Sequence, residues 1–169
     1  MTVTVRPRAG SDLDACARLL TEVHRTDGYP VEGVADPIAW LTPATATGAW
    51  VGAFDRVVVG HALVCTATDS DDAARLWIER TAEPLTRVLV FGRLFVGAEG
   101  RKRGVGERLV RTAMTYAAER NRRLVLDVMD KDAAAIRLYE RLGWQHIGAV
   151  THHFGAGRET GAQCYAAPS

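Results

Sequence analysis

The chain has 169 residues, of which 47% are hydrophobic and 24% are charged, and 21 Lys and Arg against 20 Asp and Glu leave a net charge of +1. This length is sufficient to bury one sizeable core. The balanced charge excludes a chain-wide attraction to nucleic acid or to an anionic membrane surface, so we expect neither as a partner.

The N-terminal residues and the cysteines bear on the cellular compartment. Residues 1–10 alternate polar and apolar side chains and lack the apolar core of a signal peptide, and no stretch approaches the ~20 apolar residues of a membrane span. Three cysteines, Cys16, Cys65 and Cys164, lie far apart and form no C-x-x-C pair. This spacing predicts buried free thiols rather than a disulfide framework or a zinc site. We therefore expect a cytoplasmic protein.

Helical and strand periodicities alternate along the whole chain, without repeats or a domain linker. This mixture indicates one α/β domain over residues 1–169. The hairpin predicted around Asp55 and Arg56 lacks the usual glycine, so its turn type stays open. In chain order, the predicted elements are a strand at 3–6, a helix from Ser11 or Asp12 to about His24, a helical patch at 38–41, strands at 49–54 and 57–66, a short helix within 69–84, a strand at 87–96, a helix at 104–120, a strand at 124–128, a helix at 133–142 that Asp132 can cap, and strands at 145–150 and 163–166.

The most informative stretch is residues 89–106, where an apolar strand leads through a basic, glycine-containing turn into a long helix. The turn has the sequence Arg101-Lys102-Arg103-Gly104-Val105-Gly106. The start of a helix presents unpaired backbone N–H groups and about half a positive charge, and glycine allows a ligand to approach the backbone. These features predict a binding site for a pyrophosphate-bearing cofactor.

Two common phosphate-binding patterns do not fit this turn. The dinucleotide pattern G-x-G-x-x-G fails because Leu109 occupies the third glycine position, and the acid at the end of the next strand, Asp127, is weak support by itself. The P-loop pattern fails because no Gly-Lys-Ser/Thr occurs. The pattern that does match is Arg-x-x-Gly-x-Gly after an apolar strand, followed about 30 residues later by Ala135-Ile136-x-Leu138-Tyr139-Glu140-Arg141-x-Gly143-Trp144.

With these two motifs the chain resembles the GNAT superfamily of acyl-CoA-dependent N-acetyltransferases, closely over residues 89–148 and more loosely over 1–66. The resemblance implies a mixed, mostly antiparallel central sheet, flanked by helices on both faces and splayed at a slot for CoA. It implies acetyl-CoA as co-substrate, without a metal. The cofactor-binding residues that it implies are Leu94, Phe95 and Val96 for the pantetheine arm, Arg101, Lys102, Arg103, Gly104, Val105 and Gly106 for the pyrophosphate, and Asp132, where the family often has Asn.

The resemblance places Tyr139 near the sulfur of the cofactor as the catalytic general acid. It implies transfer of an acetyl group to the primary amine of a small molecule or peptide, directly in a ternary complex. The alternative is a catalytically silent acyl-CoA-binding or sensing module of the same fold. That alternative draws support from the strand 86–96, which lacks the glutamate that many family members carry there.

The general base, the acceptor, the acyl-chain length and the oligomeric state stay open in the sequence, although the family often forms homodimers. Tyr29, Trp40 and Trp77 fit either an acceptor pocket or core packing. Asp69, Asp71 and Asp72 fit a solvated, helix-starting cluster or attraction of a cationic substrate. The candidate bases are His61, Glu79, Glu83, His152 and His153. Of these, His61 fits a structural role inside a strand better than the role of a base.

Overall fold

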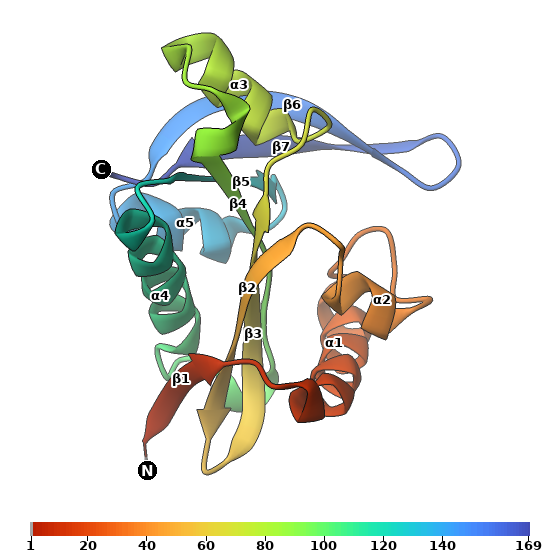
Figure 1. Ribbon diagram of the computed structural model, residues 1–169. Coiled ribbons are helices and arrows are strands. Elements are labelled where there is room, and N and C mark those ends of the chain that lie inside the picture. The colour runs from red at the N-terminus through yellow and green to blue at the C-terminus, as the bar shows by residue number, and fades with distance from the viewer. Residues whose placement is uncertain (1) are drawn as a thin grey trace. The chain divides into compact units, whose positions relative to one another are not determined.

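The computed structural model describes residues 2–169 and divides the chain into two compact units, Met1–Val64 with Arg93–Ala113 and Cys65–Gly92 with Met114–Ser169 (Figure 1). Three elements continue from one unit into the other: β3 (Val57–Thr66), β4 (Val88–Val96) and α4 (Val105–Glu119). The strands follow the order β1-β2-β3-β4-β5-β7-β6, and the β4–β5 pair is parallel. The predicted mixed, mostly antiparallel sheet accompanied by helices is confirmed.

The first unit contains the sheet order β1-β2-β3-β4. β1 (Val3–Pro7) pairs antiparallel with β2 (Ala46–Phe54), and β2 joins β3 (Val57–Thr66) through the predicted hairpin. Asp55 and Arg56 both have positive φ angles, of 50° and 67°. Positive φ at both central residues is the requirement of a type I′ turn, which this chain meets without glycine.

Two helices lie side by side in the first unit, α1 (Leu13–Asp27) and the short α2 (Pro37–Leu41) (Figure 1). A 3-10 turn at Gly10–Asp12 precedes α1. The Asp12 carboxylate accepts hydrogen bonds from the Arg6 guanidinium and the Ala9 N–H at 2.7 Å, and caps no amide of α1, so that predicted cap is wrong. Asp36 caps α2 by accepting from the Ala39 N–H at 3.0 Å.

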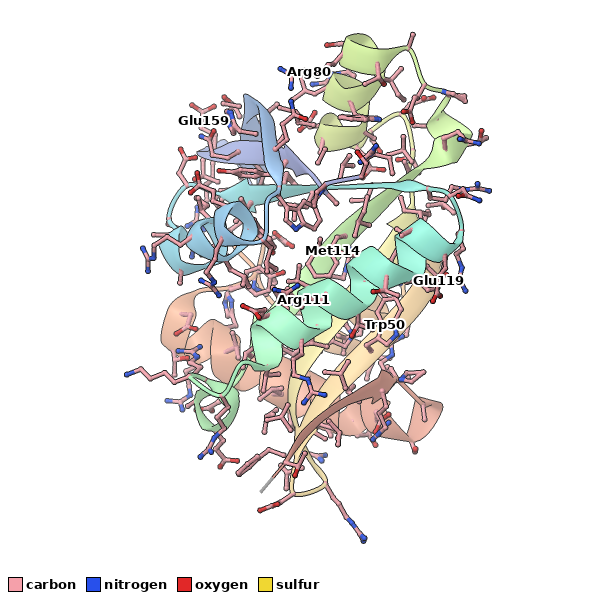
Figure 2. The ribbon with its side chains drawn as sticks, turned by 90° about the vertical axis from the view of Figure 1, so that its left-hand side faces the viewer. Trp50, Arg80, Arg111, Met114, Glu119 and Glu159 are labelled. Carbon is pink, nitrogen blue, oxygen red and sulfur yellow. The ribbon has the colours of Figure 1, made fainter. Side chains whose placement is uncertain are left out.

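The core of the first unit forms where α1 and α2 cover the sheet. Its buried residues come from α1, α2, β2 and β4. α4 (Val105–Glu119) begins in this unit, and its first turn packs close to the sheet, because a Cβ at Gly52 or Gly60 would lie 2.6 or 2.8 Å from Val105 Cγ1. Figure 2 shows Arg111 and Glu119 along α4, and both are exposed. The buried residues of this core are Cys16, Leu20, Val23, Leu41, Val51 and Phe95.

The second unit contains the sheet order β4-β5-β7-β6. β5 (Arg123–Met129) pairs antiparallel with β7 (Arg158–Ala166), which also pairs with β6 (Gln145–Phe154) in a long hairpin (Figure 1). β6 and β7 are both longer than predicted. α3 (Asp72–Thr81) packs on this sheet through Ala73, Ala74 and Trp77, and α5 (Ala133–Arg141) ends before Gly143.

Candidate functional site

The basic turn, Arg101–Gly106, follows β4 (Val88–Val96) and a short 3-10 turn at Ala98–Gly100. Lys102 and Gly104 have φ angles of 62° and 76°, which reverse the chain direction into α4. The Arg108 N–H donates to the Gly104 carbonyl at 3.1 Å, so Gly104 supplies an acceptor at the helix start. The first amides of a helix have no helical carbonyl behind them, so those of Val105 and Gly106 are positioned to donate to a ligand. All six predicted pyrophosphate-binding residues thus lie in one continuous segment with donor amides.

The side chains of the basic turn hold the loop backbone as well as carrying charge. Arg101 donates to the Val96 carbonyl at 3.1 Å and forms an ion pair with Asp27. Arg103 donates to the Glu99 carbonyl at 2.8 Å, and its guanidinium lies 4.2 Å from the centre of the Phe54 ring. Lys102 is exposed. The three cations therefore differ in role, although they are adjacent in the sequence.

The predicted pantetheine-binding residues, Leu94–Val96, form the last part of β4. The pairing of β4 with β5 comprises three residue pairs, from Val88–Arg123 to Val90–Val125, although both strands continue. Arg93 has a φ of 51°, which is unusual inside a strand and re-aims the backbone just before Leu94. The β4–β5 ladder thus ends before Leu94.

Tyr139 lies on α5 at the centre of an aromatic group, which we call the Tyr139 cluster. Its ring centre is 6.4 Å from that of Phe91, 5.5 Å from Trp144 and 6.4 Å from Tyr165. Only 4% of Tyr139 is exposed. Burial raises the pKa of the phenol, and the carboxylates of Asp132 and Asp127 add to the rise. Tyr139 therefore keeps its proton throughout the physiological range.

Asp132 occupies the N-cap position of α5, where its backbone carbonyl accepts from the Ile136 N–H at 3.1 Å. Asp132 therefore caps α5 as predicted, but through its backbone, since its side chain makes no hydrogen bond to the helix N-terminus. The backbone at this position has φ −86° and ψ 59°, and its own amide is turned back to the Met129 carbonyl at 2.9 Å.

A second titratable group with a shifted pKa is Asp127 on β5, which was not among the bases predicted from the sequence. Its carboxylate is exposed, yet the surrounding protein reduces its hydration and raises its pKa, and Asp72 and Asp71 add to that rise. A charge on His152 would act in the opposite direction. A charge on Asp127 also contributes to the raised pKa of Tyr139, after burial and Asp132. Asp127 is the one charged residue in the apolar strand 124–128, which is the signal that could have identified it.

The other candidate bases are placed less favourably. His61 is fully buried in β3, and both of its ring nitrogens have partners, which agrees with a structural sheet histidine. Glu79 is exposed and lies 3.9 Å from Arg75, and His153 is exposed and lies 3.6 Å from Glu159. Glu83 lines a pocket together with residues from the C-terminal end of α4, such as Met114 and Ala117. Of the five candidates, His152 is the one whose charge would lower the pKa of Asp127.

The predicted aromatic acceptor residues separate into two groups. In the first unit, Tyr29 and Trp40 pack edge to face with ring centres 6.0 Å apart, and Trp40 is 6.1 Å from Phe95. In the second unit, Trp77 belongs to the buried core under the Arg123 guanidinium. Tyr29 and Trp40 are half-buried, so they retain the accessible surface that an acceptor contact needs.

The cysteines are free thiols, as predicted, and all three are buried. Burial raises the pKa of Cys16 to about 11 and that of Cys164 to about 12. A thiol with such a pKa is almost entirely protonated at neutral pH, and the protonated form is a poor nucleophile. These two thiols are therefore unsuited to forming an acyl-enzyme.

Two further features concern membranes and metals. Within residues 2–169, no helix is long and apolar enough to cross a membrane. In the same residues, no group of three or more His, Cys, Asp or Glu side chains is arranged to hold a metal ion.

Solved structures with the same fold include three bacterial proteins. The N-acetyltransferase from Staphylococcus aureus Mu50 is 17% identical, with 98% of each chain covered and a TM-score of 0.73. The ribosomal-protein-S18-alanine N-acetyltransferase from Escherichia coli is 17% identical, with 99% of this chain and 94% of that chain covered and a TM-score of 0.72. The acetyltransferase yncA from Salmonella typhimurium, solved with its cofactor acetyl-CoA, is 17% identical, with 98% and 93% covered and a TM-score of 0.73.

Sequence comparison gives the family directly. No curated protein matches the chain significantly. Residues 13–144, which contain the basic turn and Tyr139, match the model of the acetyltransferase (GNAT) family. The chain therefore belongs to the acetyltransferase (GNAT) family and is, as predicted, an acetyl-CoA-dependent acyltransferase.

Proposed function

We propose that this protein transfers the acetyl group of acetyl-CoA to a primary amine of a small molecule or peptide, directly in a ternary complex. The observation that carries the proposal is the basic turn, an exposed loop that presents the donor amides of the α4 start beside three cations. We also propose that residues 1–169 act as one acetyltransferase domain. The free cysteines support a reducing, cytoplasmic compartment.

The donor is held mainly through backbone groups. The amides of the basic turn bind the pyrophosphate, and the helix dipole of α4 and the positive side chains add electrostatic attraction. The backbone of Leu94–Val96 pairs with the pantetheine arm, and a backbone N–H near Val96 stabilises the oxyanion of the tetrahedral intermediate. The early end of the β4–β5 pairing supports this assignment, because it leaves backbone groups of β4 available to a ligand.

The acceptor amine needs a base before it can attack. An amine with a pKa of about 10.4 is neutral in only about one molecule in a few thousand at pH 7, a cost of roughly 4–5 kcal/mol. We assign the proton to the Asp127 carboxylate, whose pKa also responds to a charge on His152. A raised pKa brings Asp127 closer to the working pH than an ordinary aspartate, and its exposure admits a substrate or a relaying water. The amine nitrogen then forms its bond to the thioester carbon.

Collapse of the tetrahedral intermediate breaks the carbon–sulfur bond and leaves a thiolate. A thiol pKa of ~8.5 against ~10 for an ordinary tyrosine makes full proton transfer from the phenol uphill by roughly 2 kcal/mol. The raised pKa of buried Tyr139 makes that transfer still less favourable. Tyr139 therefore acts by donating a hydrogen bond to the developing thiolate, and the proton reaches the sulfur afterwards from solvent or another acid.

The acceptor class follows from the proposed base and from one of the solved structures. Primary amines are cations at neutral pH, and the carboxylates at Asp127, Asp71 and Asp72 provide a negative potential where the amine must lose its proton. The structure from Escherichia coli is that of a ribosomal-protein-S18-alanine N-acetyltransferase, which supports peptide amines alongside small amines as acceptors.

The decisive experiment measures release of free CoA thiol from acetyl-CoA while a panel of small amines and peptide N-termini is added one at a time. We expect a rise in thiol release with at least one acceptor and a mass increase of one acetyl group on that acceptor. Tight CoA binding without transfer to any member of a broad panel would instead favour the silent acyl-CoA-binding module.

A further inference from the structure

The strained residue Arg93 in β4 is held by a buried histidine. Its φ of 51° places a non-glycine residue in the left-handed region, which persists only where the surroundings fix it. The Arg93 carbonyl lies 2.9 Å from Nδ1 of His61, which is 0% exposed in the neighbouring strand β3. A carbonyl can only accept, so Nδ1 of His61 carries the proton.

The second ring nitrogen of His61 fixes its protonation state. Nε2 lies 2.9 Å from the Arg8 guanidinium, which can only donate, so Nε2 is an unprotonated acceptor. Burial lowers the pKa of His61 to about 4, in agreement with a neutral ring. The ring also stacks on Phe95 with centres 5.0 Å apart and planes 18° apart. Both ring nitrogens and one ring face of this imidazole therefore have a defined contact.

The two arginines also reach the same short helix. Arg8 donates to the Leu41 carbonyl at 2.7 Å, and Arg93 Nε donates to the Trp40 carbonyl at 2.8 Å with its guanidinium 5.0 Å from the Trp40 ring centre. Consecutive carbonyls at the end of α2 are thus bound from β4 and from the residue that follows β1. We call Arg8, His61 and Arg93 the clamp.

We propose that the clamp is a positioning device for the donor, in which His61 acts through the Arg93 carbonyl to set the backbone course of Leu94–Val96. The next residue after the strained one, Leu94, begins the segment assigned to the pantetheine arm. His61 also supports that segment directly, because its ring stacks on Phe95. His61 is then a positioning residue rather than a general base. The inference rests on the proposed function, since it requires pantetheine to pair with this part of β4.

The test compares two ligands, CoA and adenosine 3′-phosphate 5′-diphosphate, which keeps the pyrophosphate and lacks the pantetheine arm. Isothermal titration calorimetry gives both dissociation constants. The dissociation constant of the nucleotide divided by that of CoA measures how much the pantetheine arm contributes to binding. His61→Asn keeps an amide donor near the position of Nδ1, and His61→Gln keeps an acceptor near the position of Nε2 but loses the donor to Arg93. His146→Asn, a histidine on β6 bonded to Gln163, is the control.

We expect the ratio to fall at least fivefold in His61→Gln and to stay within twofold of the wild type in His61→Asn and His146→Asn, while nucleotide binding stays within twofold in all variants. The kcat for acetyl transfer should follow the same order. Equal ratios in the Gln and Asn variants, or a Gln variant with the wild-type ratio, would overturn the clamp. A wild-type ratio near one would instead overturn the proposed function, because the arm would then contribute nothing.

Discussion

The basic turn and the Tyr139 cluster belong to different units and use different chemistry. The turn is exposed and offers backbone amides, whose direction depends on φ and ψ at Lys102 and Gly104. Tyr139 is buried among aromatic rings and offers one hydroxyl, whose position depends on side-chain packing. The turn is therefore sensitive to changes in backbone conformation, and the cluster to the loss of a single hydroxyl group.

The largest expected effect comes from removing the Tyr139 hydroxyl. Tyr139→Phe keeps the ring contacts with Phe91, Trp144 and Tyr165 but removes the hydrogen bond to the developing thiolate. We expect kcat for thiol release to fall by about 10²-fold or more, with CoA affinity within about twofold of the wild type.

A matched control is Tyr165→Phe, which removes a hydroxyl from the same cluster at a residue that is also buried. Its kcat should stay within about threefold of the wild type. If the two variants slowed the reaction equally, the effect would belong to packing of the cluster, and the role of Tyr139 would be lost.

The next effect concerns Asp127. Asp127→Asn removes the proposed base while keeping the shape of the side chain, and we expect kcat/KM to fall by about 10- to 100-fold. A base acts in its deprotonated form, so wild-type activity should rise with pH through the Asp127 pKa. That pKa is raised, so the rise should lie above the pH near 4 at which an ordinary aspartate titrates.

The pH profile checks this assignment. In Asp127→Asn the acid limb attributed to this group should disappear, leaving a flat profile at a lower rate. A variant that kept the wild-type acid limb would transfer the role of base to another group, such as His152, whose charge acts on the pKa of Asp127.

These two residues also show what the sequence could predict. Tyr139 could be predicted from the sequence because its motif is local: the tyrosine, the helix and Gly143 lie within a few residues of one another. The raised pKa of Asp127 could not be predicted, because the charges that act on it lie on other parts of the chain: Asp71 and Asp72 at the start of α3, and His152 on β6, 25 residues further along. No short sequence pattern records which elements lie around β5.

The fold was predictable to a similar degree and for the same reason. Strand β4 and helix α4 follow from the apolar run at 87–96 and the helical spacing after Gly104, and both are confirmed. The clamp was hidden, because Arg8, His61 and Arg93 are 53 and 32 residues apart. The positive φ of Arg93 and Arg56 was hidden as well, since arginine rarely adopts it and tertiary contacts must impose it.

A smaller effect is expected from the backbone of the basic turn. Gly104 has a φ of 76°, and a Cβ there would meet no atom within 4 Å, so Gly104→Ala introduces conformational strain without a clash. We expect a loss of about 1 kcal/mol in the free energy of unfolding and about five- to tenfold weaker CoA binding, because the amides of the turn shift. Thermal unfolding and titration calorimetry give the two quantities.

Gly33→Ala is the matched control, since Gly33 has a φ of 95° and a Cβ there would also meet no atom within 4 Å. It should lose similar stability and keep wild-type CoA affinity. If both variants bound CoA equally well, the backbone geometry at Gly104 would have no part in binding.

The smallest expected effect comes from the arginines of the basic turn. The Arg101 side chain is 44% exposed and pairs with Asp27, so Arg101→Ala removes one screened charge and a contact with the Val96 carbonyl. We expect CoA affinity to fall about two- to fivefold at low salt and less at high salt.

Arg111→Ala removes an exposed arginine paired with Glu107 on α4 (Figure 2) and should leave affinity within about 1.5-fold. A smaller loss in Arg101→Ala than in Gly104→Ala is expected because the backbone amides bind the pyrophosphate more strongly than the side chains do. A loss larger in Arg101→Ala than in Gly104→Ala would reverse this order and make the donor site one of charged side chains.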